Sequence, residues 1–345
     1  MRRNVIRIAL VTVLLVGAGG ALATGAAAEC TYPVTVEDHT GTTVEVTTPA
    51  DRVVVLEPAA AQIIWAIGAE DRVVGMPVGE YTSYLDGSET KTDVTGSSIE
   101  SIDVETVIAQ QPDLVIAPNY VGNATIRQLR TAGITVYQRS EPASLDEIYT
   151  QTRLFGQFLG ACSAADQTVV DMRQHVETIE TAVTDRDSPR VLYYFFGYAA
   201  GEETFIGELI TTAGGENVAS EAGITGFRPI SEEVIAQSDP EWIVTPSHAG
   251  VPTNETPFME TTAVQSDQVL VVDADRVSQP GPRVVTPLTR MAHAFHPNAT
   301  LPVADTTVNA STPPTSEDPQ PGFGIGVAAT ALAGAGILAH RRRNA

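Results

Sequence analysis

Short apolar runs alternate with segments of helical periodicity along most of this chain. Residues 52–56 and 190–196 are continuous apolar runs, which are typical of strands buried on both faces of a parallel sheet. Further strand-like runs occupy 72–75, 134–137 and 269–273, and helical patterns occupy 60–67, 125–132, 205–213 and 284–295. Residues 34–47 alternate around a Thr-Gly turn and predict a β-hairpin. Strands that alternate with helices predict an α/β fold with mostly parallel sheets.

The segment 145–187 carries no strand signal. Apolar residues recur there at helical spacing, from Leu145 to Leu159 and again from Val169 to Val183. We expect a long helical linker with a break near residues 161–163. The linker divides the body into an N-terminal α/β lobe, 29–144, and a C-terminal α/β lobe, 188–298.

One pattern occurs twice in the body of the chain. Residues 101–118 and 229–246 each contain a short capped helix with the sequence Val-Ile-Ala-Gln, a turn with proline, a buried strand and a closing proline. The copies lie farther apart than the period of a solenoid, about 20–50 residues. We therefore expect two related lobes with a cleft between them. In each copy a glutamate, Glu105 or Glu232, stands two residues before the Val-Ile-Ala-Gln sequence.

Both ends of the chain have the pattern of targeting signals. Residues 1–28 combine a basic start, an apolar core and three alanines, which predicts a secretory signal. The pair Arg2-Arg3 is compatible with twin-arginine or general export. Residues 321–345 contain Pro-Gly-Phe, an apolar run and three arginines, and this order resembles the archaeal sorting signal called PGF-CTERM. The resemblance implies removal of the tail and lipid attachment at the outer face of the membrane, and a single-span anchor is the alternative.

Residues 299–320 are rich in Thr, Pro, Ser and Asp. Such a segment cannot bury a core, so we expect a disordered stalk. Two glycosylation sequons lie on expected loops of the lobes, and two lie at the start and in the middle of the stalk. Their asparagines are Asn123, Asn254, Asn298 and Asn309.

The chain is strongly acidic, with a net charge of −22, and Lys91 is its only lysine. Low lysine with many acidic residues resembles the proteins of extreme halophiles, in which molar salt screens self-repulsion. We therefore expect a haloarchaeal origin. The acidity also makes binding to nucleic acid, itself a polyanion, unfavourable.

The two cysteines, Cys30 and Cys162, suggest a disulfide, because their number is even and the protein is predicted to be exported. The alternative is that Cys30 is a lipidated N-terminal residue. Glu29 argues against lipidation, because glutamate is a poor residue directly before a lipidated cysteine.

Four blocks of the body, 52–75, 111–116, 204–218 and 280–297, follow one another in the order and spacing of a known family. They resemble the iron-chelate/vitamin B12 class of substrate-binding proteins of ABC importers. The resemblance implies two α/β lobes joined by one long helix, the class III arrangement, with the ligand in a cleft between the lobes. It also implies a monomer that works with a permease dimer and its ATPase.

The same resemblance gives Glu105 and Glu232 a role. In that family one surface glutamate on each lobe pairs with permease arginines. The alternative is that each acid only complements the dipole of its own helix. Glu57 departs from the family, which usually has serine before Pro58, so the ligand chemistry at this first strand–turn–helix loop stays open.

Candidate ligand-binding residues lie on the loops expected to face the cleft, because loops at the carboxyl ends of parallel strands line the crevice of an open α/β sheet. Aromatic rings with a few cations suit a large, flat, partly anionic ligand such as a corrinoid or a ferric chelate. Ordinary packing is the alternative for each tyrosine, and a local structural bond is the alternative for the last arginine. The candidates are Pro58, Tyr81, Tyr84, Tyr120, Tyr198, Phe227, Arg228 and Arg283.

Enzymes are disfavoured, because the sequence has no nucleophile elbow, dinucleotide-binding motif or Walker loop. The six histidines are scattered; His293 and His296 lack a third partner, so we expect neither a zinc site nor a resident cofactor. We expect an extracellular protein that delivers a cobalamin-type corrinoid or a ferric siderophore to an ABC importer. The alternative is a surface-anchored chelate- or haem-binding protein that senses or sequesters its ligand without a permease.

Overall fold

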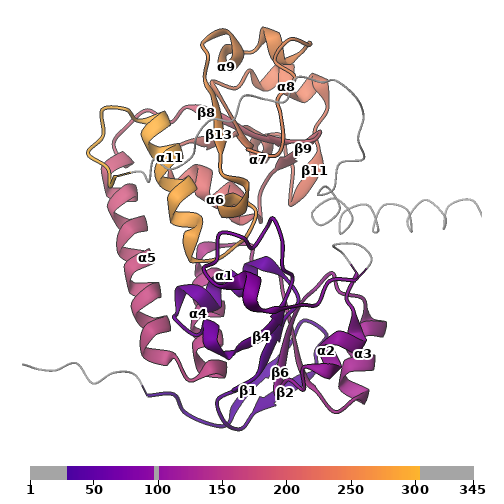
Figure 1. Ribbon diagram of the computed structural model, residues 1–345. Coiled ribbons are helices and arrows are strands. Elements are labelled where there is room, and N and C mark those ends of the chain that lie inside the picture. The colour runs from indigo at the N-terminus through magenta and orange to yellow at the C-terminus, as the bar shows by residue number, and fades with distance from the viewer. Residues whose placement is uncertain (1–28, 97–100, 304–345) are drawn as a thin grey trace, which may run out of the picture.

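Two α/β lobes lie one above the other, and a long helix runs beside both (Figure 1). The structure is a computed structural model that describes residues 29–96 and 101–303. The expected signal at 1–28, the sequon at Asn309, the stalk beyond residue 303 and the sorting segment at 321–345 lie outside these residues. No helix within the described residues is long and apolar enough to cross a membrane.

The N-terminal lobe contains a five-stranded parallel sheet in the order β5-β4-β3-β6-β7. Its strands are β3 (Val53–Val55), β4 (Val73–Met76), β5 (Thr92–Asp93), β6 (Leu114–Pro118) and β7 (Thr135–Arg139). The helices are α1 (Pro58–Ala66), α2 (Val104–Ala109) and α3 (Asn123–Thr131), and the predicted hairpin forms β1 (Val34–Glu37) and β2 (Thr43–Val46).

Both faces of this sheet are covered. Successive side chains of a strand point to opposite faces; Val53 and Val55 pack with α1 and the hairpin, whereas Val54 packs with α2 and α3. The central strand is therefore fully buried, which explains its continuous apolar sequence.

The C-terminal lobe has the sheet order β11-β9-β8-β12-β13, with β10 paired to β8. Its strands are β8 (Arg190–Phe195), β9 (Tyr198–Ala200), β10 (Glu216–Asn217), β11 (Phe227–Pro229), β12 (Trp242–Pro246) and β13 (Val269–Val272). Its helices are α6 (Phe205–Thr212), α7 (Val218–Glu221), α8 (Glu232–Ser238), α9 (Thr262–Gln265), α10 (Ala274–Val277) and α11 (Val285–Phe295). The sequence did not predict β9 and β11, which pair antiparallel at one edge of the otherwise parallel sheet.

Four short 3₁₀ helices are found in the connections of the described residues. They are Glu70–Arg72, Ser88–Thr90, Phe258–Glu260 and Pro282–Val284. The last of them precedes α11 and reaches the other lobe, where it lies against α1.

The repeated pattern forms the same unit in both lobes, as expected from the sequence. The first copy gives α2 and β6, and the second gives α8 and β12. Strand β6 lies between β3 and β7, and β12 lies between β8 and β13, with parallel pairing in each case. The helix caps differ by one residue relative to the glutamates: Asp103 caps α2 two residues before Glu105, whereas Ser231 caps α8 directly before Glu232.

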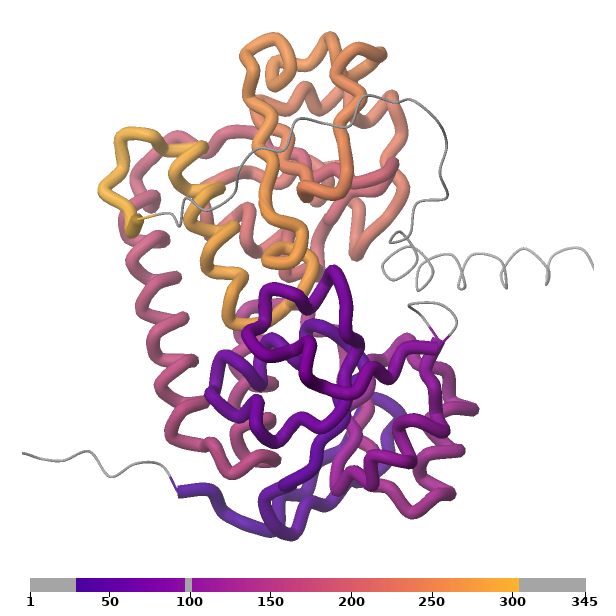
Figure 2. The backbone as a smooth tube through the Cα atoms, viewed as in Figure 1, coloured from indigo at the N-terminus to yellow at the C-terminus, as the bar shows by residue number. Residues whose placement is uncertain are grey.

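The linker is a helical hairpin of α4 (Leu145–Leu159) and α5 (Cys162–Val183), with the predicted break between them. Gly160 ends α4 with a positive φ of 71°, a conformation that favours glycine. Phe155 and Phe158 of α4 pack into the N-terminal core, whereas Val169 and Ile179 of α5 pack into the C-terminal core. The long α5 therefore runs along both lobes, as Figure 2 also shows.

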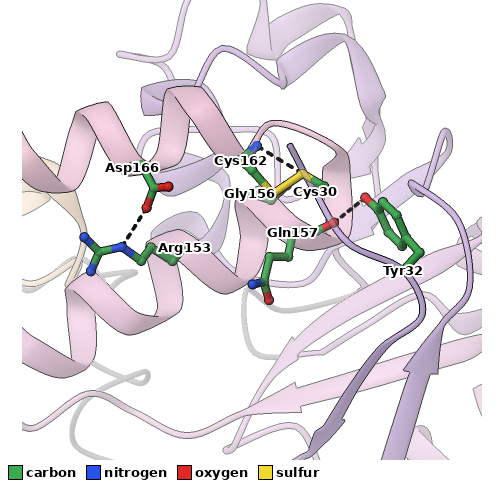
Figure 3. Close-up of a disulfide and its surroundings, with 7 residues drawn as sticks. All are labelled: Cys30, Tyr32, Arg153, Gly156, Gln157, Cys162 and Asp166. Carbon is green, nitrogen blue, oxygen red and sulfur yellow. Dashed lines mark hydrogen bonds and ion pairs between the residues drawn. A yellow bond between two sulfur atoms is a disulfide. The ribbon is translucent and has the colours of Figure 1, made fainter. Parts of the chain in front are cut away.

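A disulfide between Cys30 and Cys162 ties the start of the described chain to the first residue of α5, which confirms the predicted pairing. Figure 3 shows this bond beside the turn between α4 and α5. The Tyr32 hydroxyl donates to the Gln157 carbonyl at 2.5 Å, on the other side of the turn. The N-terminal segment is thus attached to the linker by a covalent bond and by hydrogen bonds.

Candidate ligand-binding site between the two lobes

The carboxyl ends of the parallel strands in both lobes meet at one junction. Helix α1 follows β3, and the loop at residues 278–284 follows β13 and α10. These two segments contact each other across the lobes. Ligands of open α/β sheets bind outside the carboxyl ends of the strands, so this junction is the candidate site.

Three polar side chains, Gln62, Tyr84 and Gln279, form a network with backbone groups across the junction. Gln62 of α1 is buried; its Oε1 accepts the backbone N–H of Arg283 at 3.1 Å, and its Nε2 lies 3.4 Å from the Gln279 carbonyl. The Tyr84 hydroxyl donates to Gln279 Oε1, and Gln279 Nε2 donates to the Tyr81 carbonyl at 3.0 Å. The network holds the 278–284 loop against the N-terminal lobe.

Two predicted ligand residues, Tyr84 and Arg283, lie in this network and contact each other. The Arg283 guanidinium carbon is 3.9 Å from the centre of the Tyr84 ring, a cation–π contact between the lobes. Burial raises the pKa of Tyr84, so its hydroxyl stays protonated and can keep donating to Gln279. Both side chains are half-buried, and their contact joins the two lobes.

A second group of charges lies where β3 and β7 end. The buried Arg139 guanidinium binds both carboxylate oxygens of the buried Glu57, donates to Gln151 Oε1 at 2.8 Å and lies 3.5 Å from Glu141. Burial acts to lower the pKa of Arg139, but Glu57 and Glu141 outweigh burial and raise it. The charge of Arg139 is therefore satisfied by Glu57, the residue that departs from the family pattern.

Glu141 combines exposure with desolvation. Its side chain is 43 % exposed, yet desolvation is the largest cause that raises the pKa of its carboxyl. Glu141 comes two residues after the end of β7, so its carboxyl lies at the carboxyl ends of the strands, beside Arg139.

Acidic side chains from both lobes also meet at the junction. Desolvation and the nearby Asp273 and Glu80 raise the pKa of Asp275, Arg283 opposes them, and the net result is a pKa of about 6. Asp275 and Asp273 belong to the C-terminal lobe, whereas Glu80 belongs to the N-terminal lobe. The loop that carries Glu80 reaches across the junction, because the carbonyl of the next residue, Tyr81, accepts a hydrogen bond from Gln279.

The remaining predicted ligand residues fall into two places. Tyr198 and Phe227 pack on Phe195, with ring centres 5.7 and 5.8 Å apart, in the C-terminal lobe. Arg228 beside them is exposed. Pro58, the first residue of α1, and Tyr120, after β6, are half-buried in the N-terminal lobe, and Tyr120 influences the pKa of Arg139.

The sequence did not single out Phe196 and His248 at this junction. Phe196 follows β8, His248 follows β12, and their ring centres are 5.7 Å apart. Gly197, directly after an apolar strand, could have indicated a hairpin turn beside Phe196, because Gly favours a positive φ in hairpins. Nothing in the sequence near His248 distinguishes it from the other scattered histidines.

The predicted docking residues lie away from the junction. Glu105 and Glu232 are both exposed in the first turn of their helices, one in each lobe. In Figure 1, α2 and α8 both lie on the side opposite α5. Of the predicted sequon residues, Asn123, Asn254 and Asn298 are exposed, and Asn123 begins α3 where a loop was expected.

Comparison with known proteins defines the class. A family model described as periplasmic binding protein matches residues 53–275, so the chain belongs to this family of solute-binding proteins. Among residues 29–96 and 101–303, no group of three or more His, Cys, Asp or Glu side chains could hold a metal ion.

The chain is similar to a cobalamin-binding protein of Halobacterium salinarum, with 39% identity over 333 residues, covering 90% of this chain and 89% of that protein. It is 29% identical over 280 residues to an ABC transporter substrate-binding lipoprotein of Bacillus subtilis, covering 77% and 87%. The solved apo structure of the periplasmic heme-binding protein RhuT from Roseiflexus sp. RS-1 is 25% identical with a TM-score of 0.64, covering 72% of this chain and 98% of that one.

Proposed function

We propose that this chain is the exported, surface-anchored substrate-binding protein of an ABC importer and that its cargo is a corrinoid. The observation that carries the proposal is the 39% identity to a cobalamin-binding protein across 90% of the chain. The targeting patterns at residues 1–28 and 321–345 support export and anchoring.

The charges at the junction support a corrinoid over a polycarboxylate chelate. Glu57 neutralises Arg139, and Arg283 stacks on Tyr84. Four further carboxylates lie at the junction: Glu80, Glu141, Asp273 and Asp275. A haem would bring two propionates to these acids, whereas the periphery of a corrinoid is mostly neutral amides that both donate and accept hydrogen bonds.

Equilibrium dialysis in molar KCl tests the cargo. We expect the purified protein to retain cyanocobalamin and to retain neither haemin nor a ferric hydroxamate. Replacing Glu141→Gln removes one carboxylate and should improve the affinity for haemin, whereas the matched variant Glu177→Gln, on the exposed face of α5, should not. Retention of haemin or the hydroxamate without retention of cobalamin contradicts the proposal.

Delivery to a permease is supported by the glutamate pair. Two exposed carboxylates, one per lobe, can bind two arginines of a dimeric permease in one orientation. The Debye length is about 3 Å at 1 M salt, so only close contacts would hold in brine. The rival function, sequestration without a permease, requires neither carboxylate.

Charge reversal distinguishes the two functions. We expect the double variant Glu105→Arg/Glu232→Arg to bind cobalamin normally and to abolish uptake by cells. A matched double variant, Glu45→Arg/Glu177→Arg, changes the same charge at exposed positions elsewhere and should transport normally. Normal uptake with the first variant would leave only the helix-dipole role for the pair.

A further inference from the structure

The end of the described chain is held against the C-terminal lobe and the end of α5. The Arg186 guanidinium, just after α5, donates to the Asn298 carbonyl at 3.3 Å. The ring of His293 on α11 hydrogen-bonds the Pro302 carbonyl at 2.7 Å, and Leu301 packs against the core of the lobe. In Figure 1 this end of the chain, in yellow, lies beside α5. The segment after α11 therefore has a defined position.

Asn298 stands at an exposed corner of this segment. The Ala299 N–H donates to the His296 carbonyl at 2.9 Å, which closes a turn with Pro297 and Asn298 at its two central positions. Proline is favoured at the first of these positions, because its ring fixes the φ that the turn requires. Asn298 itself is exposed, and Thr300 completes its sequon. The side-chain amide of Asn298 is therefore accessible in the folded protein.

A groove lies between this segment and α5. Its volume is about 660 Å³, which falls within the range of about 300–1,000 Å³ that small-molecule sites occupy. Amide, carboxylate, hydroxyl and guanidinium groups together donate and accept hydrogen bonds, as the hydroxyls of a sugar require. The polar side chains that line the groove are Gln174, Glu177, Thr178, Thr181, Arg186 and Thr300.

The sequon borders the groove directly. Thr300, its third residue, lines the groove, and Arg186, which also lines it, binds the Asn298 carbonyl. A group attached to the Asn298 amide therefore begins at the rim of a polar groove of suitable size.

The sequon at Asn254 provides a comparison within the same chain. The Glu255 N–H donates to the Pro252 carbonyl at 3.0 Å, so exposed Asn254 has the same position in its turn as Asn298. No residue of that sequon lines the groove beside α5. The two asparagines thus share local geometry and differ in what surrounds them.

We propose that Asn298 carries an N-linked glycan and that its first sugars lie in the groove between α5 and the segment after α11. The inference requires export but is independent of the cargo and of the permease. The Asn298 amide nitrogen forms a bond to the anomeric carbon of a lipid-linked sugar phosphate. The bond from that carbon to the phosphate oxygen breaks, the lipid phosphate leaves with the electron pair, and the amide loses one proton to the transferase.

Protein from two sources tests the modification and the contact. One sample is purified from the native host, and the other from a bacterial host that attaches no N-glycans. Mass spectrometry should find a sugar mass on the Asn298 peptide of the native-host protein. Thr300→Ser keeps the sequon and should keep that mass, whereas Asn298→Gln removes it.

Thermal unfolding in molar KCl then reports whether the sugars contact the groove. We expect Asn298→Gln to lower the melting temperature of the native-host protein by about 2 °C, the effect of losing about one net hydrogen bond. The same substitution should have no effect in the bacterial protein. Thr178→Ala/Thr181→Ala should lower the melting temperature more in glycosylated wild type than in Asn298→Gln, because interacting groups are not additive. The control Asn254→Gln should melt like wild type.

Three results overturn the proposal. An unmodified Asn298 peptide in the native-host protein excludes the glycan. Equal melting temperatures of glycosylated wild type and Asn298→Gln, or an equal fall in both sources, show that the sugars do not lie in the groove. Binding of cobalamin is measured separately, and its loss would refute the proposed function without affecting this inference.

Discussion

A single methyl group added at Gly281 tests whether the polar network holds the two lobes together. Gly281 lies buried in the 278–284 loop with φ −176° and ψ −173°, an extended conformation that alanine adopts without strain. Its added Cβ would stand 2.5 Å from Gln62 Oε1, 3.2 Å from Gln62 Cδ and 3.3 Å from Ile63 Cγ1. The effect of Gly281→Ala is therefore steric and acts between the lobes.

The size of the effect follows from what Gln62 must give up. Gln62 can move only by breaking its bonds to the Arg283 N–H, the Gln279 carbonyl and the Tyr84 hydroxyl. Overpacking of a buried site costs about 1–3 kcal/mol, and each lost neutral hydrogen bond costs about 1 kcal/mol. We expect Gly281→Ala to lower the free energy of unfolding by about 2–4 kcal/mol.

Urea titration in molar KCl, followed by tryptophan fluorescence, measures this loss. The two tryptophans report on different lobes, Trp65 from α1 and Trp242 from β12. The control Gly79→Ala lies on the exposed loop before Tyr81 with no atom within 4 Å of the added Cβ, and should unfold like wild type. If Gly281→Ala and Gly79→Ala unfold at the same urea concentration, the network does not hold the lobes.

Three further predictions concern covalent and charged groups. Replacing Cys30 and Cys162 by serine opens a loop with a sequence separation of 132 and should cost about 3–5 kcal/mol in denaturant unfolding; an unchanged midpoint would refute this. Glu57→Ala leaves the Arg139 charge buried without its main partner and should lower the free energy of unfolding by about 3–5 kcal/mol. A loss as small as that of a surface substitution would contradict this and would show that water solvates Arg139. The pKa of Asp275 is raised to about 6 in the folded protein, so the folded carboxyl binds a proton more readily than the unfolded one. The stability that this protonation contributes is present at pH 4–5 and is lost as the pH rises through 6. Asp275→Asn should therefore gain in melting temperature over wild type at pH 7.5 but not at pH 4.5, and an equal difference at both pH values would contradict this.

Local patterns predicted most of the fold. The repeat predicted that α2–β6 and α8–β12 are equivalent, because helix caps, turns and buried strands each depend on residues that are consecutive in the sequence. The break between α4 and α5 was predicted because the apolar helical pattern stops at Leu159 and resumes at Val169. The pairing of β9 with β11 was missed, because these short strands carry little apolar pattern and pair across an intervening helix pair, α6 and α7.

The site was predictable only in its position. The carboxyl ends of strands identified the junction, and Glu57 was recognised as unusual. Its partner Arg139 could not be predicted, because the two residues are 82 positions apart. Likewise Tyr84 and Gln279, 195 positions apart, meet only through the packing of the lobes. Sequence patterns report on neighbours along a strand or helix and carry no information on such distant contacts.

The central claim is that a cobalt corrinoid binds between the facing carboxyl ends of the two sheets. The most direct measurement is the cobalt anomalous difference density of crystals grown with cyanocobalamin. We expect one strong peak between the lobes, bordered by the ends of β3, β6 and β7 on one side and of β8 and β12 on the other. Crystals without a cobalt peak, or with a peak only on an outer face of a lobe, would contradict the account.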